Sequence, residues 1–291
     1  MPYFYLIFCV IAISVSSVCA EFFNRRFTDG RDRTPFYILI TACVALLGWA
    51  ILWAFDSGFE RGVLAYSLVF SVGYMLSMTF FTLAVRTGPV SLTSLFLQIS
   101  NTSAAVWGFF FWEDTEATVF AVVGLVLVVV SLALCLLGKR TDGEKKITPR
   151  WILFVALMFL GNGSCTIIQK EEQLRFHGSY GSMMMFFSML FVSGMSLIVF
   201  FCSPKQGTRE TMKRAGWLPA VGATCNVVLN LFVIRLAKTS LSPSVIYPVL
   251  AVGGLALTTL ISVICFRERL SRVQWAGLGL GAVAVALLNL G

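Results

Sequence analysis

Amide side chains stand inside segments of the chain that are otherwise apolar. Asn162, Thr166, Gln169 and Gln173 are separated by four, three and four residues, so a helix places them along one stripe. Polar side chains of a lipid-embedded helix turn toward the bundle interior or a water-filled cavity. Amides both donate and accept hydrogen bonds, which suits a neutral or zwitterionic metabolite. The stripe therefore predicts one wall of a binding cavity, with Asn162 near the middle of its segment.

Other segments carry polar residues at similar spacing, and each has a purely structural alternative. An amide in a membrane helix can instead bond a neighbouring helix, which is worth about 1 kcal/mol. Gly161 and Gly163 flank Asn162, so the backbone there can closely approach either a ligand or another helix. The candidate cavity residues are Ser17, Tyr74, Gln98, Asn101, Asn162, Gln169, Asn226, Asn230 and Tyr247.

Charged and metal-binding residues do not gather in the middle of any apolar segment. Lys170, Glu171 and Glu172 come at the end of theirs, where we expect a solvated helix end, with gate residues as the alternative. The single histidine, His177, is expected in a surface loop. The eight cysteines are scattered without a C-x-x-C motif, so they indicate neither a metal site nor a disulfide framework. We expect no catalytic residue, no metal and no cofactor, and a cation/proton antiporter with a midplane carboxylate is disfavoured.

Composition indicates an integral membrane protein. Of the 291 residues, 58% are hydrophobic and 12% are charged, whereas soluble domains carry about 25% charged residues. The apolar runs are long and do not alternate with polar residues, which favours helices over a barrel. The net charge of +8 comes from short loops and does not require a nucleic-acid partner.

Ten segments are long and apolar enough to span a bilayer as helices. The first lacks the basic start of a signal peptide, so we interpret it as a retained helix. The predicted spans are residues 3–20, 36–55, 62–85, 89–111, 117–137, 151–169, 180–201, 215–236, 241–265 and 272–290.

The two halves of the chain resemble each other on either side of a polar linker at residues 138–150. Pro89 matches Pro243, Glu113 matches Glu268 and Gly124 matches Gly279, at offsets that drift by one residue. Five helices per repeat is an odd number, so the second repeat enters the membrane from the opposite side, as in many transporters. The predicted organisation is a first five-helix repeat at 1–137, a cytoplasmic linker at 138–150 and a second five-helix repeat at 151–291. The alternative is an old duplication that serves packing alone.

Basic residues predict the orientation. Loops after odd-numbered helices hold 17 of the 22 lysines and arginines, as a count along the sequence shows. The positive-inside rule then places these loops in the cytoplasm and both termini outside.

These features resemble the drug/metabolite transporter superfamily, in its EamA-like ten-helix branch. The shared features are the five-plus-five repeat, the short loops AVRTGPVS and LAKTSLSPS, and a glutamate before each repeat's last helix, at Glu113 and Glu268. The resemblance covers nearly the whole chain and implies a central cavity lined by the first, third and fourth helices of each half. Many members of the family have both termini in the cytoplasm, and the charge bias of this chain departs from that pattern.

The sequence therefore predicts an all-α integral membrane protein that is not an enzyme. We expect a secondary transporter of a small organic metabolite in the plasma or inner membrane, working by alternating access as a monomer or homodimer. Its expected partners are a small-molecule substrate and membrane lipid, with no nucleic acid. The alternative function is a flippase for a lipid or lipid-linked sugar, or an integral membrane enzyme.

Overall fold

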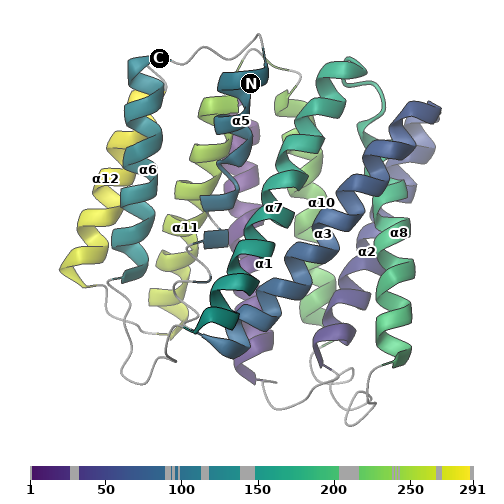
Figure 1. Ribbon diagram of the computed structural model, residues 1–291, viewed down its shortest axis with the longest axis horizontal. Helices are drawn as coiled ribbons and strands as arrows, with labels where there is room; N and C mark the ends of the chain where they lie inside the picture. Colours follow the sequence, from purple (N-terminus) through teal and green to yellow (C-terminus); the bar gives the residue numbers. More distant parts are fainter. Residues whose placement is uncertain are drawn as a thin grey trace. The chain divides into compact units, whose positions relative to one another are not determined.

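The described part of the chain is helical and contains no strand. The computed structural model describes residues 2–26, 33–88, 93, 96–97, 99–112, 118–137, 148–202, 216–237, 239, 241, 243–266 and 271–288. The helices with defined bounds are α1 (Pro2–Arg26), α2 (Arg33–Asp56), α3 (Arg61–Thr87), α5 (Ser103–Phe111), α6 (Val119–Leu137), α7 (Pro149–Arg175), α8 (Gly181–Cys202), α10 (Trp217–Ala237), α11 (Pro243–Phe266) and α12 (Arg272–Leu288) (Figure 1).

Six helices are long and apolar enough to cross a membrane, among the residues that the structure describes. They are Tyr3–Ala20, Phe36–Asp56, Arg61–Ala84, Pro149–Arg175, Gly181–Cys202 and Trp217–Leu236, with a shorter apolar helix at Val119–Ser131. Each matches a predicted span within a few residues, apart from the end of the sixth span. That helix was expected to end near residue 169 but continues to Arg175.

Helix starts follow from local sequence. The hydroxyl of Thr148 accepts a hydrogen bond from Trp151 N at 3.2 Å, and Pro149 supplies the fixed φ that suits a first helical position. At α12, Ser271 and Gln274 exchange side-chain and backbone hydrogen bonds of 2.8 and 3.2 Å, which is a capping box. These caps satisfy N–H groups that the first helical turn leaves without partners.

The chain forms two compact packing units, which are not the two predicted repeats. The first unit contains Tyr3–Val72 and Glu171–Lys238, and the second contains Gly73–Lys170 and Thr239–Gly291. Each unit thus combines segments from both halves of the sequence. Since repeats need not fold as separate units, the repeat boundaries stay a prediction.

In the first unit, serines join α3 to α8. Ser67 Oγ donates to Met184 O at 3.1 Å, and one turn later Ser71 Oγ donates to Ser188 O at 3.1 Å. Ser188 Oγ in turn approaches Ser67 O at 3.2 Å. Residue numbers rise together along both helices, so α3 and α8 run parallel. Small hydroxyl side chains of this kind allow close helix packing in membranes.

Also in the first unit, α1 packs antiparallel to α10. Cys9 Sγ lies 3.7 Å from Leu229 O, and Tyr5 stacks on Phe232 with ring centroids 5.4 Å apart. Toward the other end of α1, a Cβ placed on Gly222 would lie 3.7 Å from Ser16 Oγ. Residue numbers therefore rise along α1 while they fall along α10.

In the second unit, the later part of α3 crosses α7 at two glycines. A Cβ placed on Gly73 would lie 2.6 Å from Ser164 Oγ and 3.0 Å from Gly161 O. A Cβ placed on Gly161 would lie 2.7 Å from both Gly73 O and Ser77 N. The two backbones meet because neither residue has a side chain, and the pairing shows that the helices are antiparallel here.

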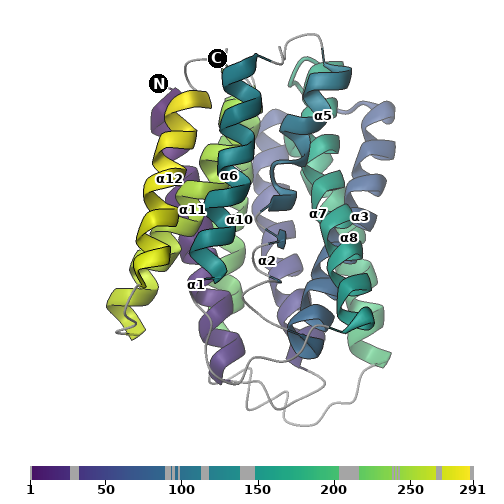
Figure 2. The same cartoon turned by 60° about the vertical axis from the view of Figure 1, so that its left-hand side comes forward.

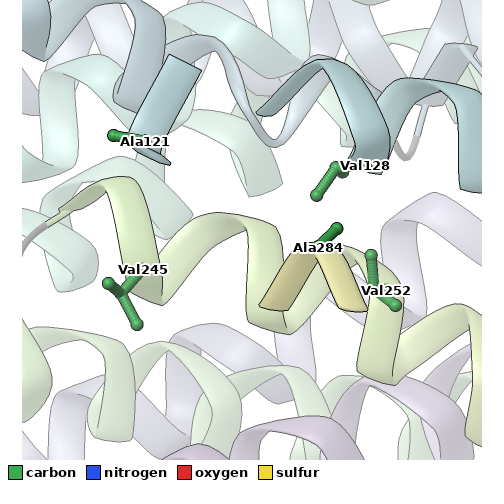
Figure 3. Packing of buried hydrophobic residues seen from close by; sticks show 5 residues of the cluster. All are labelled: Ala121, Val128, Val245, Val252 and Ala284. Atoms are coloured by element: carbon green, nitrogen blue, oxygen red, sulfur yellow. The ribbon is translucent and has the colours of Figure 1, made fainter. Parts of the chain in front are cut away.

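Apolar residues of α6, α11 and α12 form a core of the second unit. Ala121 and Val128 of α6 face Val245 and Val252 of α11 together with Ala284 of α12 (Figure 3). In both ribbon views α6 and α12 lie side by side (Figure 2). Ser131 Oγ of α6 also donates to Gly277 O of α12 at 2.7 Å. A Cβ placed on Gly281 of α12 would lie 2.6 Å from Ser131 Oγ, so this glycine permits the close contact of the two helices.

Candidate functional site

The predicted helix at 89–111 is interrupted in its second half. Residues 99 and 100 are helical, Asn101 and Thr102 form a turn, and α5 begins at Ser103. Thr102 N and Thr102 Oγ1 both donate to Ile99 O, at 2.9 and 2.6 Å. Because its hydroxyl turns back in this way, Thr102 gives the start of α5 no side-chain cap. The expectation of one continuous helix was therefore wrong at this point.

Asn162 of α7 bonds directly to that interruption. Its Nδ2 atom donates to Ser100 Oγ and to Asn101 Oδ1, each at 2.8 Å. Both amide hydrogens are thereby used, and the described residues offer no donor to Asn162 Oδ1. Asn162 is half-buried and Ser100 is fully buried. The amide thus holds two helical segments together and keeps one acceptor oxygen for a further donor.

Gly163 permits this close approach. A Cβ placed on Gly163 would lie 2.7 Å from Ser103 Oγ and 3.0 Å from Ser103 Cβ. Farther down the same pair of segments, Trp151 Nε1 donates to Thr93 Oγ1 at 3.0 Å. Since residue numbers rise together from Thr93 to Ser103 and from Trp151 to Gly163, the two segments run parallel.

The amides of α10 bond within their own helix. Asn230 Nδ2 donates to Asn226 O at 2.9 Å and to Asn226 Oδ1 at 3.0 Å. Both residues are half-buried and belong to the first packing unit. Asn226 and Asn230 are four residues apart, and this spacing predicted that both face one cavity. In the structure the same spacing lets the two side chains bond each other within the helix.

The other candidates have varied surroundings. Gln169 of α7 is buried, with 5% of its surface exposed. Ser17 of α1 and Tyr74 of α3 are half-buried. Gln98 and the side chain of Tyr247 lie outside the described residues. The structure brings Asn162 and Asn101 into contact, and Asn226 and Asn230 into contact, while a cavity role for the set stays a prediction.

The charged end of α7 differs from expectation. Lys170 and Glu172 are 4% and 0% exposed, so they do not form a solvated helix end. The helix continues past them, and Gly178 N closes it with a hydrogen bond of 2.9 Å to Gln173 O. His177, in the turn that follows, is exposed as predicted. A charge at the end of an apolar run is usually solvated, so little in the local sequence indicated this burial.

Ser100 was missed as a residue of interest, and Glu172 was expected at a solvated helix end, whereas the structure buries it. Ser100 looked like one more small residue of an apolar helix, although the polar run from Ser100 to Ser103 was a sign of the interruption. Within the described residues, no group of three or more His, Cys, Asp or Glu side chains could hold a metal ion.

Comparisons with known proteins establish the fold. No protein-family model matches the chain. A protein of Haemophilus influenzae (strain ATCC 51907 / DSM 11121 / KW20 / Rd) described as uncharacterized is 25% identical over 199 residues, which are 67% of this chain and 62% of that protein. The chain thus spans less than two thirds of that relative's length. A solved structure titled "Crystal structure of protein" aligns with 99% of this chain and 96% of its own, with a TM-score of 0.70 and 13% identity. The chain therefore shares its helical fold with a protein of known crystal structure.

Proposed function

We propose that this protein is a secondary transporter of small neutral or zwitterionic metabolites in the cell membrane. The observation that carries the proposal is the interruption at Asn101 and Thr102, bonded to Asn162 of α7. In membrane transporters, discontinuous helices mark substrate sites because irregular backbone is tolerated only where it meets protein or a cavity. Asn162 Oδ1 then accepts a hydrogen bond from the substrate.

The directions of packed helices support ten alternating spans. In such a chain, odd-numbered helices run one way and even-numbered helices the other. The third and seventh helices, α3 and α8, run parallel. The sixth helix, α7, runs antiparallel to α3 and parallel to the fourth segment. The first and eighth helices, α1 and α10, run antiparallel. Every pair has the direction that ten crossings require.

Two helix pairs support the inverted repeat. In a five-plus-five arrangement, α2 corresponds to α8 and α6 corresponds to α12. Each of these helices packs against its own counterpart, as happens beside a two-fold axis. The arrangement fits the resemblance to the EamA-like branch of the drug/metabolite transporter superfamily. We infer that residues 138–150 face the cytoplasm, because this segment contains five basic residues. With five spans on either side of it, both termini then lie outside the cell.

Transport is tested with purified protein in liposomes. Thermal unfolding is screened against a panel of amino acids, amines, nucleosides and sugars, and each compound that stabilises the protein is then assayed for flux. Asn162→Ala should reduce the flux about tenfold or more, since a hydrogen bond in a site is worth about 1.5 kcal/mol. Ser131→Ala is the matched control, because it removes a bond between α6 and α12.

Two results would reject parts of the proposal. Wild-type flux by a folded Asn162→Ala variant would remove Asn162 from the substrate site. Movement of labelled phospholipid between leaflets, with no flux of any panel compound, would favour the flippase function.

A further inference from the structure

Arg235 is an exposed cation in the last turn of α10, a helix that is long and apolar enough to cross a membrane. The apolar span of this helix runs from Trp217 to Leu236, so Arg235 stands at its very end. Its two chain neighbours, Ile234 and Leu236, are buried, whereas Arg235 itself faces outward. An arginine at the end of a membrane span reaches the level of the phospholipid headgroups, where its guanidinium keeps its charge.

The guanidinium of Arg235 keeps its hydrogen-bond donors for a further partner. Among the described residues, Arg235 interacts with the ring of Phe232, 6.0 Å from Cζ to the ring centroid, and forms no ion pair with a carboxylate. Arg175, which is exposed at the end of α7, instead donates from NH1 to the hydroxyl of Tyr66 at 3.1 Å. The carbonyl end of α10 stabilises a cation here, but this attraction does not use the five N–H donors of the guanidinium.

Aromatic rings of α1 and α10 fix the place of this guanidinium. Phe232, three residues before Arg235, stacks on Tyr5 of α1 with ring centroids 5.4 Å apart. Phe8 meets the same ring at 5.6 Å, and Phe4 meets Phe8 at 4.6 Å. A cation is attracted to the face of an aromatic ring, so Phe232 restricts the freedom of the arginine side chain. A ligand that binds Arg235 therefore has less side-chain freedom to remove.

An exposed apolar stripe of α1 begins level with Arg235. Because α1 runs antiparallel to α10, its first turn lies beside the last turn of α10. Phe4, Phe8 and Ile11 are 55%, 38% and 45% exposed, and their spacing of four and three residues places them on one side of α1. The stripe extends along about 10 Å of helix. All these residues belong to the first packing unit, so this surface is formed within that unit.

A cation at headgroup level beside an apolar stripe is the complement of an anionic phospholipid. The planar guanidinium presents paired N–H donors, which match two oxygens of a phosphate group. The apolar stripe takes an acyl chain, for which a small free anion has no counterpart. The ammonium of a zwitterionic headgroup would lie close to the positive charge of Arg235, so a headgroup with a net negative charge is favoured.

We propose that Arg235 and the exposed stripe of α1 bind an anionic phospholipid. The lipid phosphate accepts hydrogen bonds from the guanidinium of Arg235, and one acyl chain lies along Phe4, Phe8 and Ile11. The bound lipid thereby joins the first turn of α1 to the last turn of α10. The inference goes beyond the proposed function, because it does not depend on any transported compound.

The test measures lipid binding to the purified full-length protein by native mass spectrometry from detergent micelles. Dioleoylphosphatidylglycerol and dioleoylphosphatidylcholine are titrated separately, since they share their acyl chains and differ in headgroup charge. We expect the first phosphatidylglycerol to bind about fivefold more tightly than the first phosphatidylcholine, which corresponds to about 1 kcal/mol for one basic residue near anionic lipid. Arg235→Gln should abolish this preference. Arg175→Gln is the matched control, because it removes an exposed arginine that already bonds Tyr66.

Two further variants keep the test decisive if Arg235→Gln does not fold. Arg235→Lys keeps the charge but loses the paired donors, and Phe232→Leu keeps the arginine but removes the ring beside it, so both should reduce the preference in part. Displacement of the lipid by an equal concentration of glycerol 3-phosphate, which has no acyl chain, would overturn the lipid site in favour of a free anion. Equal affinity of the wild type for both lipids, an equal loss in Arg175→Gln, or an undiminished preference in the Arg235 and Phe232 variants would also overturn it.

Discussion

Asn162 and Asn230 are the same residue type in two similar apolar helices, yet their amides form different kinds of bond. Asn162 donates to Ser100 and Asn101 on another helical segment, whereas Asn230 donates to Asn226 one turn earlier in its own helix. The difference lies in the partner. An interrupted segment presents side chains and a turn to Asn162, while Asn226, which bonds Asn230, belongs to a regular helix. An amide stripe therefore indicates a site only where another element supplies its partners.

The largest difference between the two regions should come from their glycines. Gly161→Ala places a Cβ 2.7 Å from two backbone atoms of α3, Gly73 O and Ser77 N. Backbone cannot move aside as a flexible side chain does, so α3 and α7 must separate, at a cost of about 1–3 kcal/mol in the free energy of unfolding. Denaturation in mixed micelles measures this cost.

Gly222→Ala on α10 is the matched substitution in the other region. Its Cβ would meet Tyr37 Oη at 3.5 Å, an ordinary van der Waals distance. The change should therefore be neutral or stabilise the helix by up to about 1 kcal/mol. Equal destabilisation by the two alanines would mean that the α3–α7 contact is no tighter than the surroundings of Gly222.

Helix bounds were predictable because the length of an apolar run is a local property of the sequence. The interruption at Asn101 and Thr102 had one weak local sign, the polar run from Ser100 to Ser103. Because Ser94, Gln98 and Asn101 also fit the spacing of an unbroken helix, this sign did not decide the prediction. The burial of Glu172 and Gln173 was equally hidden. It depends on Gly181 and on Ile234 of α10, which is more than 50 residues away in the sequence. The bonding of Asn162 depends in the same way on a partner 61 residues away.

The second-largest effect should come from removing the amide of Asn162. Asn162→Leu deletes two bonds between helical segments, and such bonds are worth about 0.6 kcal/mol each in membrane proteins. We therefore expect a loss of about 1–2 kcal/mol in the free energy of unfolding. The bonds to Asn226 that Asn230→Leu deletes lie within α10, so we expect a cost below about 0.5 kcal/mol from their loss. Each variant carries one Asn-to-Leu substitution, and a reversed order of the two costs would contradict the comparison.

Removing one of the two acceptors should have an intermediate effect. Ser100→Ala leaves Asn162 bonded to Asn101 and also deletes the bond from Ser100 Oγ to Leu97 O. The expected cost is about 0.5–1 kcal/mol. Combining Ser100→Ala with Asn162→Leu should cost less than the sum of the single changes, since both remove the same bond. Strict additivity in this double-mutant cycle would show that the bond contributes nothing.

The smallest effect belongs to Asn226→Ala. The substitution removes the Oδ1 acceptor, yet Asn230 Nδ2 keeps its bond to the Asn226 backbone oxygen at 2.9 Å. Alanine also has the higher helix propensity, which offsets part of the lost bond. The free energy of unfolding should therefore change by less than about 0.5 kcal/mol. If Asn226 nevertheless binds substrate, as its place in the polar stripe of α10 predicts, flux in liposomes should fall while stability is retained. Wild-type flux together with wild-type stability would mean that Asn226 does not bind substrate and that this part of α10 serves packing alone. The substrate contacts would then have to come from other helices. The interruption beside Asn162 would be the first place to test.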